Sequence, residues 1–193
     1  MFGLTKIVAA LSLAVALVGA APTVQRRQSA CFLVGKTALP AEVATSIPAL
    51  ASQVTCGSTT IANTGGVPDV ISGGISYSSI DFQKSTKSPV GFALDKFKTP
   101  TDPATADLAT LQNQLNTYLA MEAGVRSTGS SILGRLKGTK FFLQFQIARV
   151  RTARGETLGV ADTVEHQLGK VIKNAVGATQ AEKDAVTALS KQL

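Results

Sequence analysis

Residue types that support the common enzyme chemistries are sparse in this 193-residue chain. His166 is the single histidine, and it lies opposite the apolar side of a helical pattern, beside Asp162 and Lys170, which indicates a surface residue. A Ser-His-Asp hydrolase would need this histidine, yet the chain contains no Gly-x-Ser-x-Gly motif. Zinc and di-iron sites need several ligands at close spacing, which the chain lacks. We therefore predict no metal site, no cofactor and no catalytic residue.

Cys31 and Cys56 are the only two cysteines. In an oxidising compartment an even pair usually forms a bridge. The bridge would close a loop of about 26 residues, for which the chain-entropy estimate is roughly 3.5 kcal/mol of stabilisation. Two free thiols or a pair of metal ligands are the alternatives. We expect one disulfide.

Carboxylate chemistry remains as the enzymatic alternative, because two acids suffice for a glycosidase. Against it, the chain has no Trp and only 5% aromatic residues, a poor surface for stacking sugars. Glu122 is the most informative acid, since it interrupts an apolar helical stripe and should be partly buried. A buried carboxylate needs a partner or a proton. Arg126, Arg149 and Arg151 are candidate partners, and we predict a buried ion pair with Arg149; exposure at the stripe edge and an acid/base role stay open.

A basic block follows Glu122. Between Ala123 and Gly155 the chain has no acid and these seven cations: Arg126, Arg135, Lys137, Lys140, Arg149, Arg151 and Arg154. We expect Arg135, Lys137, Arg151 and Arg154 to face outward together as a patch for an anionic glycan or a membrane surface. The alternative is a solvated face that acids elsewhere in the fold balance. The Gly-rich stretch 127–139 lacks the spacing of a phosphate-binding loop.

The N-terminal residues predict export. Lys6 precedes an apolar run, Ile7–Val18, of about 12 residues, too short to span a membrane but typical of a signal peptide. Small residues ending at Ala20 favour cleavage after that position. The pair Arg26-Arg27 matches the site of a dibasic processing protease, which predicts a signal peptide over 1–20, a short pro-segment over 21–27 and a single secreted domain over 28–193. We expect an extracellular protein with no transmembrane span.

The elements that must position these residues are mainly helical. We predict a mainly α (α+β) fold, a helical bundle with a small β-hairpin annex. In the N-terminal half, the expected elements are a strand or extended segment at 31–34, a helix over 40–54 with a kink or break at Pro48, a hairpin over 69–78 around Gly73-Gly74, and a helix over 90–97. In the C-terminal half, they are a helix from an Asp102 cap to Val125, a helix over 160–175, and a last helix after the capping box Thr179–Glu182. The segment 141–153 fits both a strand and a helix, and we expect a helix because its neighbours are long helices.

Three segments carry a resemblance. Ser79–Phe82, Gln114–Arg126 and Lys140–Leu143 resemble an uncharacterised family of small fungal secreted proteins, and the similarity covers most of the mature chain with both cysteines. Its motifs are packing patterns, so the resemblance implies an extracellular location and brings no catalytic residues.

Two classes of function follow. The first is a non-enzymatic secreted protein, effector-like or on the cell surface, that binds an anionic glycan, a membrane surface or a host protein. The second is a small secreted hydrolase with a carboxylate pair. The formal net charge of +7 includes Lys6, Arg26 and Arg27, which processing would remove. The mature domain would be only mildly basic, which argues against dedicated nucleic-acid binding.

Overall fold

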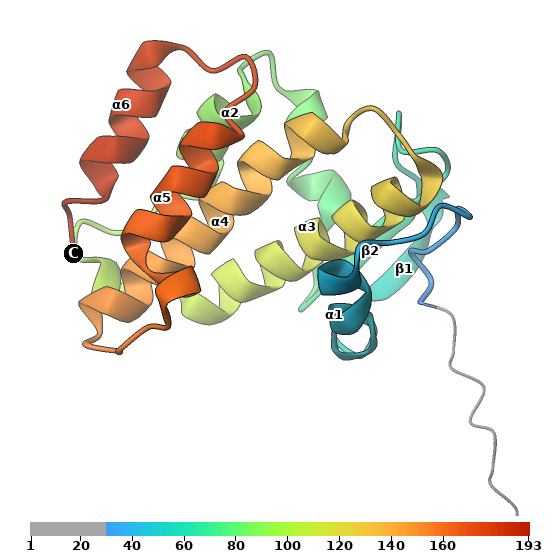
Figure 1. The fold of residues 1–193 in the computed structure, drawn as a ribbon, viewed down its shortest axis with the longest axis horizontal. Helices are drawn as coiled ribbons and strands as arrows, with labels where there is room; N and C mark the ends of the chain where they lie inside the picture. Colours follow the sequence, from blue (N-terminus) through green and yellow to red (C-terminus); the bar gives the residue numbers. More distant parts are fainter. Residues whose placement is uncertain (1–29) are drawn as a thin grey trace, which may run out of the picture.

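A computed structural model describes residues 30–193 and shows a helical protein with a small antiparallel sheet at one end (Figure 1). The α-helices are α1 (Ala41–Ala51), α2 (Pro89–Lys96), α3 (Leu108–Thr128), α4 (Leu133–Ala153), α5 (Val164–Lys173) and α6 (Gln180–Leu189). The strands β1 (Thr55–Thr60), β2 (Pro68–Ser72) and β3 (Ile75–Ser76) pair in that order. This arrangement confirms the mainly α fold with a β annex. The predicted signal peptide, the pro-segment and the processing residues Ala20, Arg26 and Arg27 lie outside the described residues.

The long helices α3 and α4 form a central antiparallel pair (Figure 1). Asp107 caps α3 by accepting a hydrogen bond from the Thr110 backbone N–H at 3.0 Å. Gly129 ends the helix with φ 71°, a conformation that favours glycine. Only residues 129–132 connect the two helices. This short connection fixes which residues of α3 and α4 face one another.

The remaining helices cover this pair. Helix α5 packs along α4, and α1 packs against α3. Helices α2 and α6 contact each other, and α2 also packs on α4 (Figure 1). Within residues 30–193, no helix has the length and apolar character needed to cross a membrane.

The sheet region is tied to the chain's first described residues by the Cys31–Cys56 disulfide, with a Cα–Cα distance of 6.1 Å. The expected bridge is therefore confirmed. The hairpin between β2 and β3 turns at Gly73 and Gly74, with φ 53° and 79°, also as predicted. Strand β1 was not predicted from the sequence; it pairs with β2.

The core of the domain joins the sheet region to the helices. Tyr118 of α3 meets the rings of Tyr77 and Phe97 edge-on, and its hydroxyl donates to the Ile80 carbonyl at 2.6 Å. Gly124 lets α3 approach the segment before α1, because a Cβ at this position would lie 2.7 Å from the Phe32 carbonyl oxygen. Larger side chains at 124 would push these layers apart.

Several local predictions differ from the structure. Helix α5 begins at Val164, four residues after the expected start, and Val160 lies in a separate 3-10 turn and is exposed. Helix α1 continues through Pro48 without a break. Residues 31–34 form a turn and irregular backbone, not an extended strand, and Phe32 is fully buried. Asp102 caps only a short 3-10 helix, Pro103–Thr105, while α3 begins after Asp107. Helix α4 begins at Leu133, eight residues before the expected start, because the glycines at 134 and 138 are tolerated inside a packed helix. The Thr179–Glu182 capping box is present as predicted.

Candidate functional site

Glu122 lies near the middle of the α3–α4 interface and is only 4% exposed. Its Oε2 accepts a hydrogen bond from Lys140 Nζ at 2.7 Å. Its Oε1 accepts from Arg126 Nη2 at 2.8 Å and from Arg126 Nε at 3.2 Å. Both carboxylate oxygens are therefore held by cations, as a buried charge requires.

Glu122 and Lys140 shift each other's pKa values. Burial alone raises the pKa of the Glu122 carboxyl, but the charges and hydrogen bonds of Lys140 and Arg126 outweigh burial and lower it below its ordinary value. Burial lowers the pKa of the Lys140 ammonium, and Glu122 offsets only part of that effect. Glu122 thus stays ionised at neutral pH and has no proton to give as a general acid.

The predicted Glu122–Arg149 pair is wrong. Arg149 instead bonds to Thr99, Gln146 and the Gln192 carbonyl. In an antiparallel helix pair joined by residues 129–132, position 122 lies opposite position 140, because both are about equally distant from the connection. Arg149 lies nine residues further along α4, which is about 13 Å along the axis and on the opposite side of the helix.

Lys140 and Glu122 lie in the wall of a groove with a volume of about 550 Å³. Helices α1 and α5 form its two sides, in front of the α3–α4 pair in Figure 1. The charged residues in its lining are Arg126, Lys137, Lys140, Lys170 and Lys173, with Glu42 and Glu122. We call this feature the basic groove.

Three lysines give the groove its excess charge. Within the described part of the chain, Lys137, Lys170 and Lys173 form no ion pair. Phe141 lies between the walls, with Lys140 Nζ 4.1 Å and Lys170 Nζ 5.7 Å from its ring centroid. These cation–π contacts hold two ammonium groups close together without neutralising either.

The predicted patch of Arg135, Lys137, Arg151 and Arg154 does not form. All four belong to α4 or its C-cap, and Arg135 and Lys137 lie about 24 Å and about 21 Å from Arg151 along the helix axis. Arg135 packs over the Phe82 ring. Arg151 pairs with Glu156 at 2.7 Å, and Arg154 donates to the carbonyls of Ala104 and Ala106.

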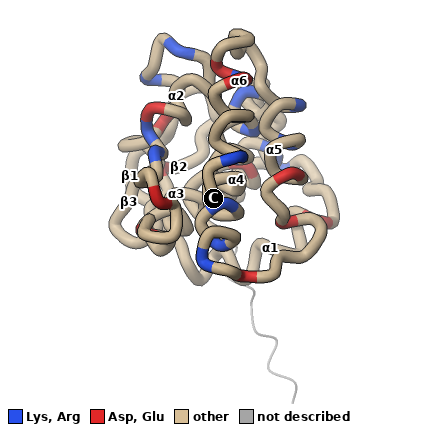
Figure 2. Tube along the Cα trace, turned by 90° about the vertical axis from the view of Figure 1, so that its left-hand side faces the viewer, with Lys and Arg blue, Asp and Glu red and all other residues tan. Residues whose placement is uncertain are grey.

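Charges elsewhere are dispersed. Viewed from the side of the C-terminus, Lys and Arg alternate with Asp and Glu over the height of the molecule (Figure 2). His166 is exposed on α5, as predicted. Within residues 30–193, no three His, Cys, Asp or Glu side chains gather in a way that could hold a metal ion. The basic groove is suited to binding an anion, because three of its lysines form no ion pair among the described residues.

Sequence reasoning named Lys137 but missed Lys140, Lys170 and Lys173 as site residues. Lys170 and Lys173 were hidden because they follow the basic block by many residues and join it only when α5 folds back on α4. Lys140 was detectable, because a correct start for α4 places it opposite Glu122. Lys140 stands among buried residues of α4, and a lysine at such a position indicates a buried acidic partner.

The similarity of the chain to known proteins covers nearly all the described residues. A family model described as a domain of unknown function, DUF7143, matches residues 33–193. The chain belongs to the DUF7143 family. The match includes every helix of the fold, every residue of the basic groove, and Cys56 but not Cys31. Comparison with curated proteins and with solved structures found no match.

Proposed function

We propose that this DUF7143 protein is a secreted, non-enzymatic binding protein that takes an anionic glycan in the basic groove. The observation that carries the proposal is the set of three groove lysines, Lys137, Lys170 and Lys173, that lack acidic partners among the described residues. A concave site with one sign of charge concentrates the field and raises the local concentration of a polyanion. The groove suits a chain-like glycan better than a membrane, because a flat bilayer cannot enter a concavity between two helices.

Export is part of this proposal. It is supported by the signal-like run Ile7–Val18, and the Cys31–Cys56 disulfide fits an oxidising, extracellular location. Fungal origin and a role as an effector or surface protein rest on the resemblance of the sequence alone.

The hydrolase alternative receives no support from the groove. Glu42 and Glu122 both line it, but a glycosidase needs one carboxyl with a raised pKa as its acid. The pKa of Glu122 is lowered instead, and both of its oxygens are occupied. The other buried acids of the described chain, Asp69 and Asp81, accept hydrogen bonds from the backbone N–H groups of Ser78 and Gln83.

Binding can be tested on immobilised heparin at low salt. The variant Lys137→Gln/Lys170→Gln/Lys173→Gln should elute at a much lower salt concentration than the unmodified protein, since exposed charges act over only about 8–10 Å at physiological ionic strength. A control variant, Lys36→Gln/Lys96→Gln/Lys191→Gln, removes the same charge at exposed positions outside the groove. Equal loss in both triple variants, or no retention of the unmodified protein, would overturn the proposal. Stronger retention on anionic liposomes than on heparin would favour the membrane instead.

The processing prediction has its own test. We expect the secreted form to begin at Gln28, and Arg27→Ala should retain the seven residues from Ala21. Intact mass spectrometry of protein from the culture medium measures both. A secreted protein that begins only at Ala21 would contradict the dibasic cut.

A further inference from the structure

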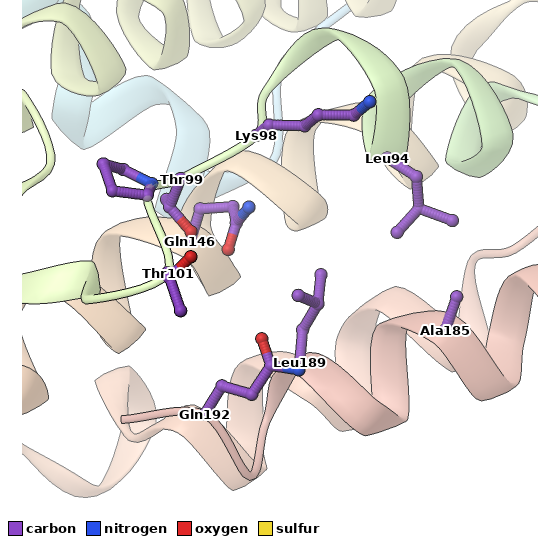
Figure 3. A pocket seen from close by; sticks show the side chains of 9 residues that line it. Leu94, Lys98, Thr99, Thr101, Gln146, Ala185, Leu189 and Gln192 are labelled. Carbon is purple, nitrogen blue, oxygen red and sulfur yellow. The ribbon is translucent and has the colours of Figure 1, made fainter.

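A second cavity lies on the other side of α4, between α2, α6 and the segment 98–101 (Figure 3). Its volume is about 710 Å³, within the usual range for small-molecule sites. The lining residues are Leu94, Lys98, Thr99, Pro100, Thr101, Gln146, Ala185, Leu189 and Gln192. Figure 3 shows Leu189 rising from α6 toward Gln146 and Thr99 across the cavity. We call this cavity the C-terminal cleft.

The cleft has one apolar side and one polar side. Leu94, Ala185 and Leu189 come from α2 and α6 and present aliphatic groups. Thr99 and Gln146 lie opposite, and their oxygen atoms are close together in Figure 3. Such a division suits a ligand that has an apolar body and a polar end.

A buried cation lies directly behind the polar side. Arg149 is 1% exposed. Its Nη1 donates to Thr99 Oγ1 at 3.1 Å and to Gln146 Oε1 at 2.6 Å, and its Nη2 donates to the Gln192 carbonyl at 2.7 Å. Since all three partners line the cleft, the guanidinium lies immediately beneath the cleft surface. Its Nε is buried and has no hydrogen-bond partner in the described part of the chain.

No carboxylate neutralises this charge within the described residues. Arg149 forms no ion pair there, and its partners are all neutral. The cleft lining contains no Asp or Glu and adds a second cation, Lys98. A buried charge without a counterion is costly. The cost falls when an anion occupies the neighbouring space.

We propose that the C-terminal cleft binds a small organic carboxylate with an apolar tail. The tail packs against Leu94, Ala185 and Leu189. The carboxylate accepts hydrogen bonds from the hydroxyl groups of Thr99 and Thr101. The Thr99 oxygen accepts from Arg149, so its own proton is free to donate to the ligand. The arginine thus acts through Thr99, while Lys98 attracts the anion at the rim.

This site is independent of the basic groove. The groove lies on the face of α4 that carries Lys140, and the cleft lies on the face that carries Gln146 and Arg149. The groove is suited to a polyanion, whereas the cleft is suited to a single negative charge and a hydrocarbon. Loss of one binding activity should leave the other unchanged.

The test uses octanoate as the probe, with octylamine and octan-1-ol as matched compounds of the same chain length. Isothermal titration calorimetry on the full secreted chain should show binding of octanoate, binding of the alcohol at least about tenfold weaker, and none of the amine. Equal affinity for octanoate and octylamine, or no binding of octanoate, would overturn the proposal.

Two variants locate the binding. Arg149→Met should weaken octanoate binding at least about tenfold. Because this variant could also disturb folding, Ala185→Trp provides a second measurement: it fills the cleft from an exposed position on α6 and should abolish binding. Thr187→Trp is the control, since it adds the same bulk on the opposite side of α6. Octanoate binding that survives Ala185→Trp would place the ligand elsewhere. The triple lysine variant of the groove should bind octanoate normally.

Discussion

Lys140 and Arg149 are both buried cations of α4, yet the protein stabilises them in different ways. Lys140 shares a carboxylate, Glu122, with Arg126. Among the described residues, the hydrogen-bond acceptors of Arg149 are neutral oxygens of Thr99, Gln146 and Gln192. The nine residues between them turn the helix by about 180°, so the two side chains point to opposite faces. The fold thus neutralises the charge of Lys140 with a carboxylate. The charge of Arg149 has only neutral partners among the described residues, so an anionic ligand could still pair with it.

This difference explains why the two faces are suited to different ligands. On the Lys140 face, Glu122 already neutralises Lys140. An anion would therefore bind to the neighbouring groove lysines, Lys137, Lys170 and Lys173. On the Arg149 face, the buried guanidinium has no counterion among residues 30–193, and a cavity lies beside it. An anion in the basic groove would replace water around exposed lysines. An anion in the C-terminal cleft would supply a counterion for the buried Arg149.

The strongest test of the comparison is Glu122→Gln. It leaves Lys140 buried without its ion-pair partner, and breaking such a pair costs about 3–5 kcal/mol. We expect this loss in the free energy of unfolding, measured by chemical denaturation. Glu165→Gln, at an exposed position on α5, should cost under about 1 kcal/mol. A Glu122→Gln variant as stable as this control would show that the pair contributes little.

Removal of the disulfide should affect the two faces unequally. Cys31→Ser with Cys56→Ser should lower stability by roughly 3.5 kcal/mol without abolishing the fold. The bridged segment contains α1, which forms one side of the basic groove but no part of the C-terminal cleft. Hydrogen exchange should therefore increase in α1 more than in α6. Two labelled free thiols in the native protein would contradict this prediction.

Arg149→Met should cost less than Glu122→Gln, because it removes a charge that already lacks a counterion. The loss comes from the Gln146 and Gln192 oxygens left without a donor, about 1–3 kcal/mol. Arg151→Met is the control on the same helix; its pair with Glu156 is largely exposed and should contribute under about 1 kcal/mol. If Arg149→Met lost more free energy of unfolding than Glu122→Gln, the uncompensated Arg149 would contribute more to stability than the Glu122–Lys140 pair, contrary to this prediction.

The smallest expected effect is on the acid dependence of stability. The pKa of Glu122 is lowered in the folded protein, so the unfolded chain binds the proton first as the pH falls. The stabilisation is fully present above the ordinary glutamate pKa, about 4.3, and is lost as the pH falls through the folded value. Thermal melts between pH 6 and 3 should show a flatter profile for Glu122→Gln and an unchanged profile for Arg149→Met. Identical profiles in the unmodified protein and both variants would show that Glu122 does not cause the acid dependence of stability.

Local sequence patterns predicted much of the fold. The two-glycine turn, the Thr179–Glu182 capping box and most of the apolar helical spacings were correct, because each depends on residues within one or two turns of one another. Val160 is an exception, since it lies before α5 and is exposed. The disulfide was predictable because the chain has only two cysteines. Burial of Glu122 was also predictable, since its position in an apolar stripe is a property of one helix.

The ion-pair partner of Glu122 could not be predicted from local pattern. Whether Lys140 or Arg149 meets Glu122 depends on where α4 begins, and the predicted start at 141 left Lys140 outside the helix. Likewise, the sequence alone gathered Arg135 and Arg151 in one patch, although a continuous helix separates them by about 24 Å. Only the return of α5 along α4 brought Lys170 and Lys173 to the groove. Residue type and local periodicity thus determined which side chains could be buried or charged. Tertiary packing decided which of them meet, because contacts between distant segments depend on helix lengths and connections that local pattern does not encode.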